Sequence, residues 1–418
     1  MPADGSAPPR RMNCNTGTMN SWHSSALNGR WLVFSSKKMG AYTQLFMTHI
    51  DENGNDSPPV WLENLKVKDR AANIPEFVNV DYDEFDQITD EFSDVADYNV
   101  RGTSKAQFGD FKNAIVDFNK ALQVDPDDDQ AYANRGKAKD ELGDLKGALA
   151  DLNKAIELNP EEHDYYIHRG NTRVKMNDLQ GAIADCSQAI ELEPGDAALY
   201  AHRAGVYQLA SALEKSVADL TRAIELRPEY ALYYVHRANV YSQLNQYSQA
   251  LQNIDRALAL EPGNVKTMTL RGIFARQAEN RDLAVKSFLQ AIEINPGYYE
   301  PYSELGILYD QLGETEKSID HFTRAIERYD QQSKRELAAI YNNRGTVYGK
   351  MEDYRQARND FSQALVFRPN FADAYSNRAF AELNLGNTRE AERDCDRALQ
   401  INPGMVKARR IKEMIRER

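Results

Sequence analysis

The hydrophobic and polar positions of residues 95–403 repeat with a period of 34 residues. An alanine, two further apolar positions and a proline recur together in a pattern close to A-I-x-L-x-P. The prolines that close this pattern are Pro126, Pro160, Pro194, Pro228, Pro262, Pro296, Pro369 and Pro403. Only the step from Pro296 to Pro369 breaks the period, and it holds two repeats with five extra residues near 329–334. The pattern therefore predicts nine repeats.

Fixed positions inside each repeat predict two packed helices. Position 4 is tyrosine in eight of the nine repeats, position 8 is always glycine or alanine, and position 27 is always alanine. Small residues at fixed spacing let two helices approach closely, and a large residue beside them fills the next gap. The proline follows the second helix, because its missing N–H prevents the helix from continuing.

At these positions the chain resembles the tetratricopeptide repeat family. The resemblance covers three quarters of the sequence and rests on several positions that agree in nearly every repeat. It implies a mainly α fold, in which antiparallel helix pairs stack into a right-handed superhelical solenoid and each repeat contacts only its neighbours. It also implies that the chain binds another protein or a peptide in a concave groove.

Charged side chains occupy two further positions of the repeat. Position 7 is arginine in eight repeats, and position 23 is aspartate in six of them: Asp117, Asp151, Asp185, Asp219, Asp360 and Asp394. The two positions fall on the two helices of one repeat, so we predict a buried Arg–Asp pair that ties the helices together. The seventh repeat lacks both residues and has Leu305 and His321 instead.

Residues 1–70 have a different pattern. Arg30–Ser36 and Tyr42–Ile50 are typical of β-strands, and the turn-rich stretch Asp51–Asp56 follows them. Over about 45 residues the order resembles one blade of a TolB-like β-propeller of the bacterial cell envelope. One blade cannot close a propeller. We therefore expect the chain to be the C-terminal part of a longer propeller protein; alternatively, the blade packs on the first helical repeat.

Two further segments flank the repeats. Residues 71–94 lie in a stretch rich in Asp and Glu without Lys or Arg, which predicts an acidic linker. Residues 404–418 carry six basic and two acidic side chains with a few apolar ones, and we predict that they form the capping helix that a solenoid needs on its last repeat.

Composition and charge narrow the functional classes. The net charge of −12 argues against nucleic-acid binding, which depends on clustered Lys and Arg. No apolar run is long enough for an integral membrane segment, and the first 25 residues lack the apolar core of a secretory signal. Three scattered cysteines predict no disulfide framework. The compartment stays open: cytoplasm, or periplasm and an envelope complex if an upstream signal and propeller precede this chain.

The sequence contains no motif of a catalytic site. The patterns G-x-x-x-x-G-K-[ST], G-x-S-x-G and H-E-x-x-H and a paired C-x-x-C are absent. We therefore predict a scaffold or adaptor that is not an enzyme and needs no cofactor. Two alternatives stay open: binding or enzymatic activity in upstream propeller blades, and a structural spacer whose groove binds nothing.

Position 6, in the first helix of each repeat, is rich in asparagine and histidine. In the family's sugar transferase the same position forms an asparagine ladder that holds a bound polypeptide, and histidine can also donate hydrogen bonds. No Asp or Glu occurs at the positions expected to line the groove of repeats three to six. The predicted peptide-binding residues are Asn134, His168, Asn171, His202, Gln208, His236, Asn239, Gln243, Asn343 and Asn377.

The histidines of this ladder are not predicted to bind a metal. Packed helices lie about 8–10 Å apart, whereas zinc holds its nitrogen ligands at about 2.1 Å. A site made of His168, His202 and His236 would therefore require the solenoid to distort.

Overall fold

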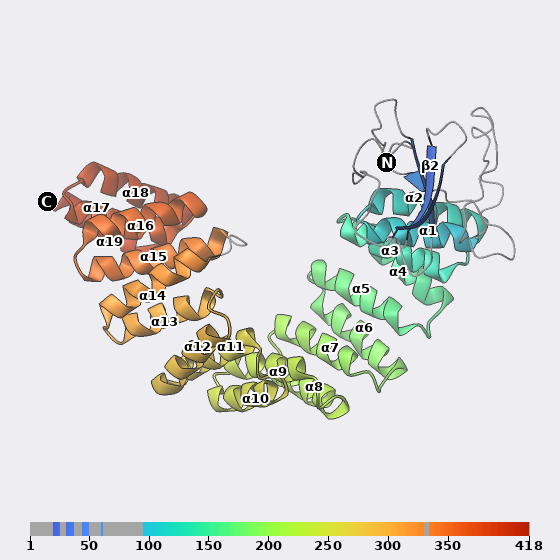
Figure 1. The fold of residues 1–418 in the computed structure, drawn as a ribbon, viewed down its shortest axis with the longest axis horizontal. Coiled ribbons are helices and arrows are strands. Elements are labelled where there is room, and N and C mark those ends of the chain that lie inside the picture. The colour runs from blue at the N-terminus through green and yellow to red at the C-terminus, as the bar shows by residue number, and fades with distance from the viewer. Residues whose placement is uncertain are drawn as a thin grey trace, which may run out of the picture. The chain divides into compact units, whose positions relative to one another are not determined.

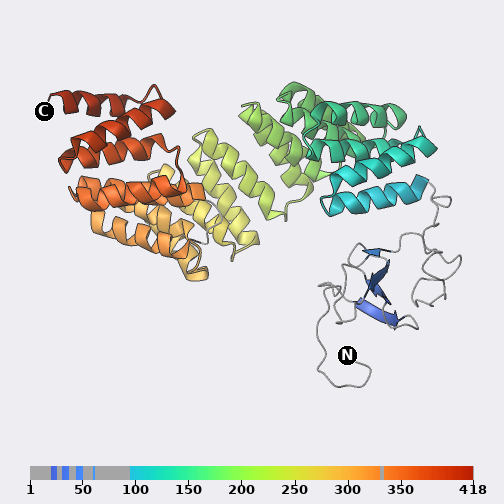
Figure 2. The ribbon, with the colours of Figure 1, turned by 90° about the horizontal axis from the view of Figure 1, so that it is seen from above.

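The computed structural model describes residues 95–329 and 334–417, and the backbone of four strands within residues 20–61. The chain divides into two compact units, Met1–Asp185 and Cys186–Arg418, called here the N-terminal and C-terminal units. In both, helices follow one another as antiparallel pairs (Figures 1 and 2). The predicted mainly α solenoid of helix pairs is confirmed for the described residues.

The strands form one antiparallel sheet in the order β1-β2-β3-β4. Their bounds are Asn20–Ser25, Trp31–Ser36, Gln44–His49 and Val60–Trp61. Strands β2 and β3 pair from Trp31 with His49 to Ser36 with Gln44, within the two stretches that the sequence indicates. The propeller resemblance stays a prediction, and the predicted linker at 71–94 lies outside the described residues.

The helices of the N-terminal unit belong to the first three repeats. They are α1 (Val95–Gln107), α2 (Phe111–Val124), α3 (Asp129–Glu141), α4 (Leu145–Leu158), α5 (His163–Lys175) and the first half of α6 (Leu179–Leu192). Aspartates begin several of these helices: the side chain of Asp110, for example, accepts a hydrogen bond from the backbone N–H of Asn113.

The C-terminal unit contains the rest of α6 and the remaining repeats. Its further helices are α7 (Ala197–Leu209), α8 (Leu213–Leu226), α9 (Ala231–Gln243), α10 (Tyr247–Leu260), α11 (Val265–Gln277), α12 (Arg281–Ile294), α13 (Glu300–Gln311), α14 (Thr315–Arg328), α15 (Lys334–Lys350), α16 (Tyr354–Phe367), α17 (Ala372–Asn384), α18 (Thr388–Ile401) and α19 (Val406–Arg416). Helix α15 begins at Lys334, so part of the insertion between repeats seven and eight lengthens its N-terminal end. Helix α19 packs Ala408 and Ile411 against the last repeat.

Positions 8 and 24 are matched in size in the repeats that carry phenylalanine at position 24, where position 8 is always glycine. A Cβ atom added to Gly102 would lie 2.5 Å from the Phe118 ring, and one added to Gly272 would lie 2.4 Å from the Phe288 ring. Where position 8 is alanine, position 24 is aliphatic: Ala204 packs with Leu220 in the fourth repeat, and Ala238 with Ile254 in the fifth. Glycine is therefore needed most strictly opposite a phenylalanine, and the second repeat has glycine opposite a leucine, where a Cβ on Gly136 would lie 3.0 Å from Leu152.

The predicted Arg–Asp pairs are confirmed in six repeats. Each arginine of a first helix donates to an aspartate of the second helix, 16 residues later, over 2.6–3.1 Å; the pairs are Arg101–Asp117, Arg135–Asp151, Arg169–Asp185, Arg203–Asp219, Arg344–Asp360 and Arg378–Asp394. Burial alone would raise the pKa of Asp117, but hydrogen bonds from Arg101 and Lys105 hold it below its usual value.

Arginines at position 7 of six repeats also reach a third helix, which the sequence does not predict. The Nη1 atom of Arg135 donates to Asn119 Oδ1 in the preceding repeat over 2.7 Å, and Arg203 Nη1 donates to Ser187 Oγ over 3.0 Å. Equivalent bonds reach Asn153, Thr221, Thr323 and Ser362. One side chain therefore joins both helices of its own repeat to the second helix of the repeat before it.

Candidate protein-binding surface

A hollow of about 150 Å³ lies between α7 and α9 in the C-terminal unit. Its lining residues come from the first helices of repeats four and five, with one from α8: Ala201, Ala204, Gly205, Gln208, Leu220, His236 and Asn239. Three of the predicted peptide-binding residues, Gln208, His236 and Asn239, meet here. None of the lining side chains is Asp, Glu, Lys or Arg, in agreement with the acid-free lining that the sequence indicates for these repeats.

A second hollow, of about 400 Å³, lies between α3 and α5 in the N-terminal unit. It contains two predicted residues, His168 and Asn171, together with charged side chains that the prediction omitted: Lys137, Asp140, Glu141 and Lys175. The Lys175 ammonium binds the Asp140 carboxylate and lies 3.7 Å from Glu141. The absence of acids in repeats three to six therefore does not extend to this hollow, because repeat two contributes two carboxylates to it.

The central histidines differ in their surroundings. The half-buried His202 ring places Nδ1 3.3 Å from the sulfur of the fully buried Cys186, so this side chain belongs partly to the interior. His236 is exposed and lines the α7–α9 hollow. Desolvation by the surrounding protein lowers the pKa of both rings below the usual 6.5. Both are therefore neutral near pH 7, where each ring nitrogen can donate or accept a hydrogen bond according to its tautomer.

Towards the C-terminal end, position 6 of the repeat holds side chains that are hydrogen-bonded within the chain. Asn377 donates to Asn342 Oδ1 over 2.9 Å, and Lys407 of α19 donates to Asn377 Oδ1. The Asn377 carboxamide is therefore bonded within the chain itself. Glu304, at the same position of the seventh repeat, accepts from Arg276 over 2.9 Å.

The remaining predicted residues lie outside both hollows. Asn134 is half-buried with Nδ2 3.5 Å from Thr103 Oγ1, Asn343 is half-buried, and Gln243 is exposed. The structure thus gathers five of the ten predicted residues at two places, two of them in the N-terminal unit and three in the C-terminal unit.

Sequence reasoning missed Gly205, which leaves the α7–α9 hollow open. A Cβ atom built on this residue would meet no other atom within 4 Å. Its signal in the sequence is a glycine at position 9 of a first helix, away from the small position 8 that helix packing requires.

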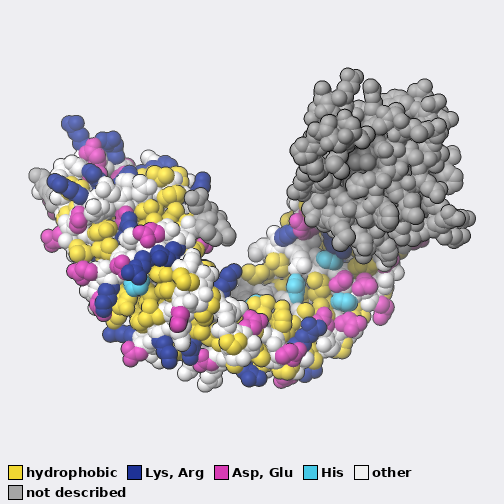
Figure 3. Space-filling view, in the orientation of Figure 1, with side chains coloured by type: hydrophobic (Ala, Val, Ile, Leu, Met, Phe, Trp, Pro, Cys, Tyr) yellow, Lys and Arg dark blue, Asp and Glu magenta, His cyan; other side chains and the backbone are white. Residues whose placement is uncertain are grey.

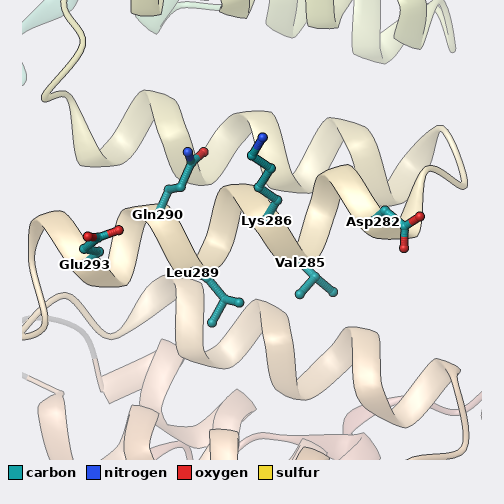
Figure 4. Close-up of a pocket in the computed structure, with 6 residues that line it drawn as sticks. All are labelled: Asp282, Val285, Lys286, Leu289, Gln290 and Glu293. Atoms are coloured by element: carbon teal, nitrogen blue, oxygen red, sulfur yellow. The ribbon is translucent and has the colours of Figure 1, made fainter.

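Two other surface features of the described residues are weaker candidates for a binding site. Glu162, His163 and Asp164 could hold a metal ion by distance, but they are consecutive residues at the start of α5, with Asp164 exposed. A shallow hollow of about 450 Å³ lies along α12, where Val285 and Leu289 point to one side of the helix and Lys286 and Gln290 to the other (Figure 4). Its polar groups do not converge on a common point.

Hydrophobic, acidic and basic side chains are interspersed on the face drawn in Figure 3, and histidines reach this surface. In the portion of the chain that the structure describes, no helix is both long enough and apolar enough to cross a membrane.

Family models described as "Tetratricopeptide repeat" match residues 129–196, 236–299, 297–368 and 372–405, and one described as "TPR repeat" matches 104–139. The chain is a tetratricopeptide repeat protein. The family predicted from the repeat pattern is confirmed.

Two relatives match this tetratricopeptide repeat protein over short stretches. Protein FlbA of Caulobacter vibrioides is 39% identical over 69 residues, which are 16% of this chain and 11% of FlbA. The human DnaJ homolog subfamily C member 7 is 33% identical over 78 residues, 19% of this chain and 16% of that protein. The chain therefore spans less than a fifth of the length of these relatives.

Among solved structures, yeast Tom70 is similar with a TM-score of 0.50 and 16% identity, over 78% of this chain and 89% of that one. At this identity the likeness shows the fold alone.

Proposed function

We propose that this tetratricopeptide repeat protein is a non-catalytic scaffold that binds an extended protein segment along the first helices of its repeats. The observation that carries the proposal is the α7–α9 hollow, where Gln208, His236 and Asn239 from two successive repeats line one opening. The repeat pattern alone predicts these three side chains as binding residues, and they share one surface recess.

The chemistry of the hollow suits a polypeptide. Carboxamides both donate and accept hydrogen bonds, as does a neutral imidazole, so the lining matches the alternating N–H and C=O groups of an extended main chain. The separate hollow between α3 and α5 of the N-terminal unit is lined by charged groups, among them Lys137 and the Lys175–Asp140 pair. It would distinguish segments by the charge of their side chains, whereas the neutral hollow would bind main chain of any sequence.

The test is a selection on the full chain from a phage-displayed library of random peptides, followed by measurement of Kd for the synthetic peptides. Replacing Gln208, His236 and Asn239 together with alanine should weaken binding at least tenfold, because each lost hydrogen bond costs about 0.5–1.5 kcal/mol. His202 is kept, since its replacement would disturb the contact with buried Cys186. A matched control replaces Ser248, Gln249 and Gln252, which are exposed on the second helix α10.

Two outcomes would reject this function. If the selection yields no peptide that binds the wild-type chain, the groove is a spacer surface. If peptides bind equally well to the triple variant and to the control, they bind elsewhere.

The β-sheet favours a second candidate, in which this chain is the C-terminal part of a propeller and tetratricopeptide repeat protein of the cell envelope. Four sequential antiparallel strands in the order β1-β2-β3-β4 match the topology of one propeller blade. Any binding or enzymatic activity of further blades would then lie upstream. Sequencing the reading frame upstream tests this candidate, which requires further strand-rich repeats of the β1–β4 type and a secretory signal. A stop codon directly before Met1 would reject it.

A further inference from the structure

Gly205 lies in the interior of helix α7, where glycine is unfavourable. It has no side chain to restrict the unfolded backbone, so a mid-helix glycine lowers stability relative to alanine. Position 9 of the neighbouring first helices holds Asn171 and Asn239, so the repeat itself does not demand a glycine here.

Packing does not explain Gly205 either. The glycines at position 8 are needed, because a Cβ on Gly272 or Gly306 would lie 2.4 or 2.7 Å from a phenylalanine ring. A Cβ on Gly205 would meet no atom within 4 Å, and its backbone dihedral φ is not positive. Alanine would therefore fit the free protein without strain.

What the glycine does is keep space open. It lines the 150 Å³ hollow together with Gln208, one turn further along α7, and with His236 and Asn239 of α9. Liquid water takes up about 30 Å³ per molecule, so the hollow holds about five waters' volume. Because the lining side chains are all uncharged, the hollow complements a neutral hydrogen-bonding group better than a carboxylate or an ammonium group.

We infer that Gly205 is the point at which the main chain of a bound extended segment crosses α7, with its peptide groups bonded by the carboxamides of Gln208 and Asn239. This inference rests on the proposed function and gives it a location and a ligand chemistry: main-chain amide rather than charged side chain. Glycine is the residue that permits close approach of a ligand backbone to a helix. A side chain at position 205 would project into the space that the peptide groups occupy.

The test uses a peptide selected on the wild-type full chain from the random phage-displayed library. Gly205→Ala should raise Tm by about 1–3 °C while weakening the Kd of that peptide about tenfold. Gly205→Leu should weaken binding further. Gly349→Ala is the matched control: Gly349 is a second helical glycine with no atom within 4 Å of an added Cβ, and it lies in α15, away from the hollow. It should leave Kd within about twofold.

A second measurement addresses the ligand. Single N-methylation along the synthetic peptide should reduce binding about tenfold at one or two consecutive positions, and alanine substitution there should have little effect. If Gly205→Ala and Gly205→Leu bind the peptide as the wild type does, while the Gln208, His236 and Asn239 triple variant loses it, the inference is wrong and the proposed function stands. If no peptide is selected, the proposed function itself fails.

Discussion

Arg203 of α7 holds Asp219 of α8 through two parallel hydrogen bonds, from Nε to Oδ2 and from Nη2 to Oδ1, each 2.7 Å long. The carboxylate is buried and the guanidinium is largely enclosed. Such a bidentate pair fixes the orientation of both side chains as well as the distance between the helices.

Asp219→Ala should lower the free energy of unfolding by about 3 kcal/mol, because it leaves a largely buried arginine without its partner. Asp219→Asn should cost less, about 1 kcal/mol, since Arg237 already uses Asn253 as acceptor over 2.8 Å in the fifth repeat. Urea denaturation followed by circular dichroism measures both variants. Equal losses for the two would show that the charge, and not only the hydrogen bonds, determines the stability of the pair.

Gly272→Ala should destabilise the chain by about 1–3 kcal/mol through overpacking, because the added Cβ would lie 2.4 Å from the Phe288 ring. Combining it with Phe288→Leu recreates the Ala204 and Leu220 pair of the fourth repeat and should recover part of the loss. Thermal melts of the two single variants and the double variant provide the comparison. If the double variant loses as much stability as the two single variants together, the size matching of positions 8 and 24 is contradicted.

His321 should make stability depend on pH. It stacks on Tyr309 with ring centroids 5.3 Å apart, and burial lowers its pKa from the usual 6.5, with Asp320, Arg324 and Lys317 as the nearby charges. The folded state therefore disfavours the protonated ring. The stabilisation that the neutral His321 ring contributes is complete above about pH 6.5. It is lost as the pH falls below that value towards the folded-state pKa.

Urea titrations at pH 7.5 and pH 5 should show a smaller loss of stability for His321→Gln than for the wild type. His202 and His236, whose pKa values are also lowered, remain in both proteins and add the same background. An identical loss in the variant would show that His321 does not contribute.

Deleting residues 1–90 should leave a folded helical protein. The first described repeat has its own buried contacts, such as Tyr98 with Ala121 and Ala131, and the Arg101–Asp117 pair. Circular dichroism should retain the molar helical signal of helices α1 to α19, with a cooperative melt. Loss of that signal would show that the N-terminal segment is part of the fold.

The sequence predicts the repeats, their boundaries and the Arg–Asp pairs because each depends on contacts within one repeat, which recur at fixed spacing. Arg101 and Asp117 are recognisable as partners since the same two residue types lie 16 positions apart in five other repeats. The contacts that the sequence does not predict join different repeats or are unique. Lys407 with Asn377 and Cys186 with His202 each occur once, so no period indicates them.

The candidate site is predictable in its residue types but not in its shape. Position 6 gives the polar side chains, yet whether they meet at a hollow depends on their neighbours. Gly205 opens the surface beside His236, whereas Lys407 covers Asn377. Both effects come from single side chains that the pattern of the repeat does not specify.

The three-helix arginine contact affects how cooperatively the repeats unfold. A linear array unfolds as one block only where each repeat is coupled to the next. The seventh repeat has Leu305 in place of this arginine, so its first helix is linked back to the sixth by the two-helix pair of Glu304 with Arg276, whereas Arg344 links the eighth to Thr323. Amide hydrogen exchange should therefore show two cooperative blocks that meet between repeats six and seven. The last three repeats should be protected as one block and the preceding repeats as another.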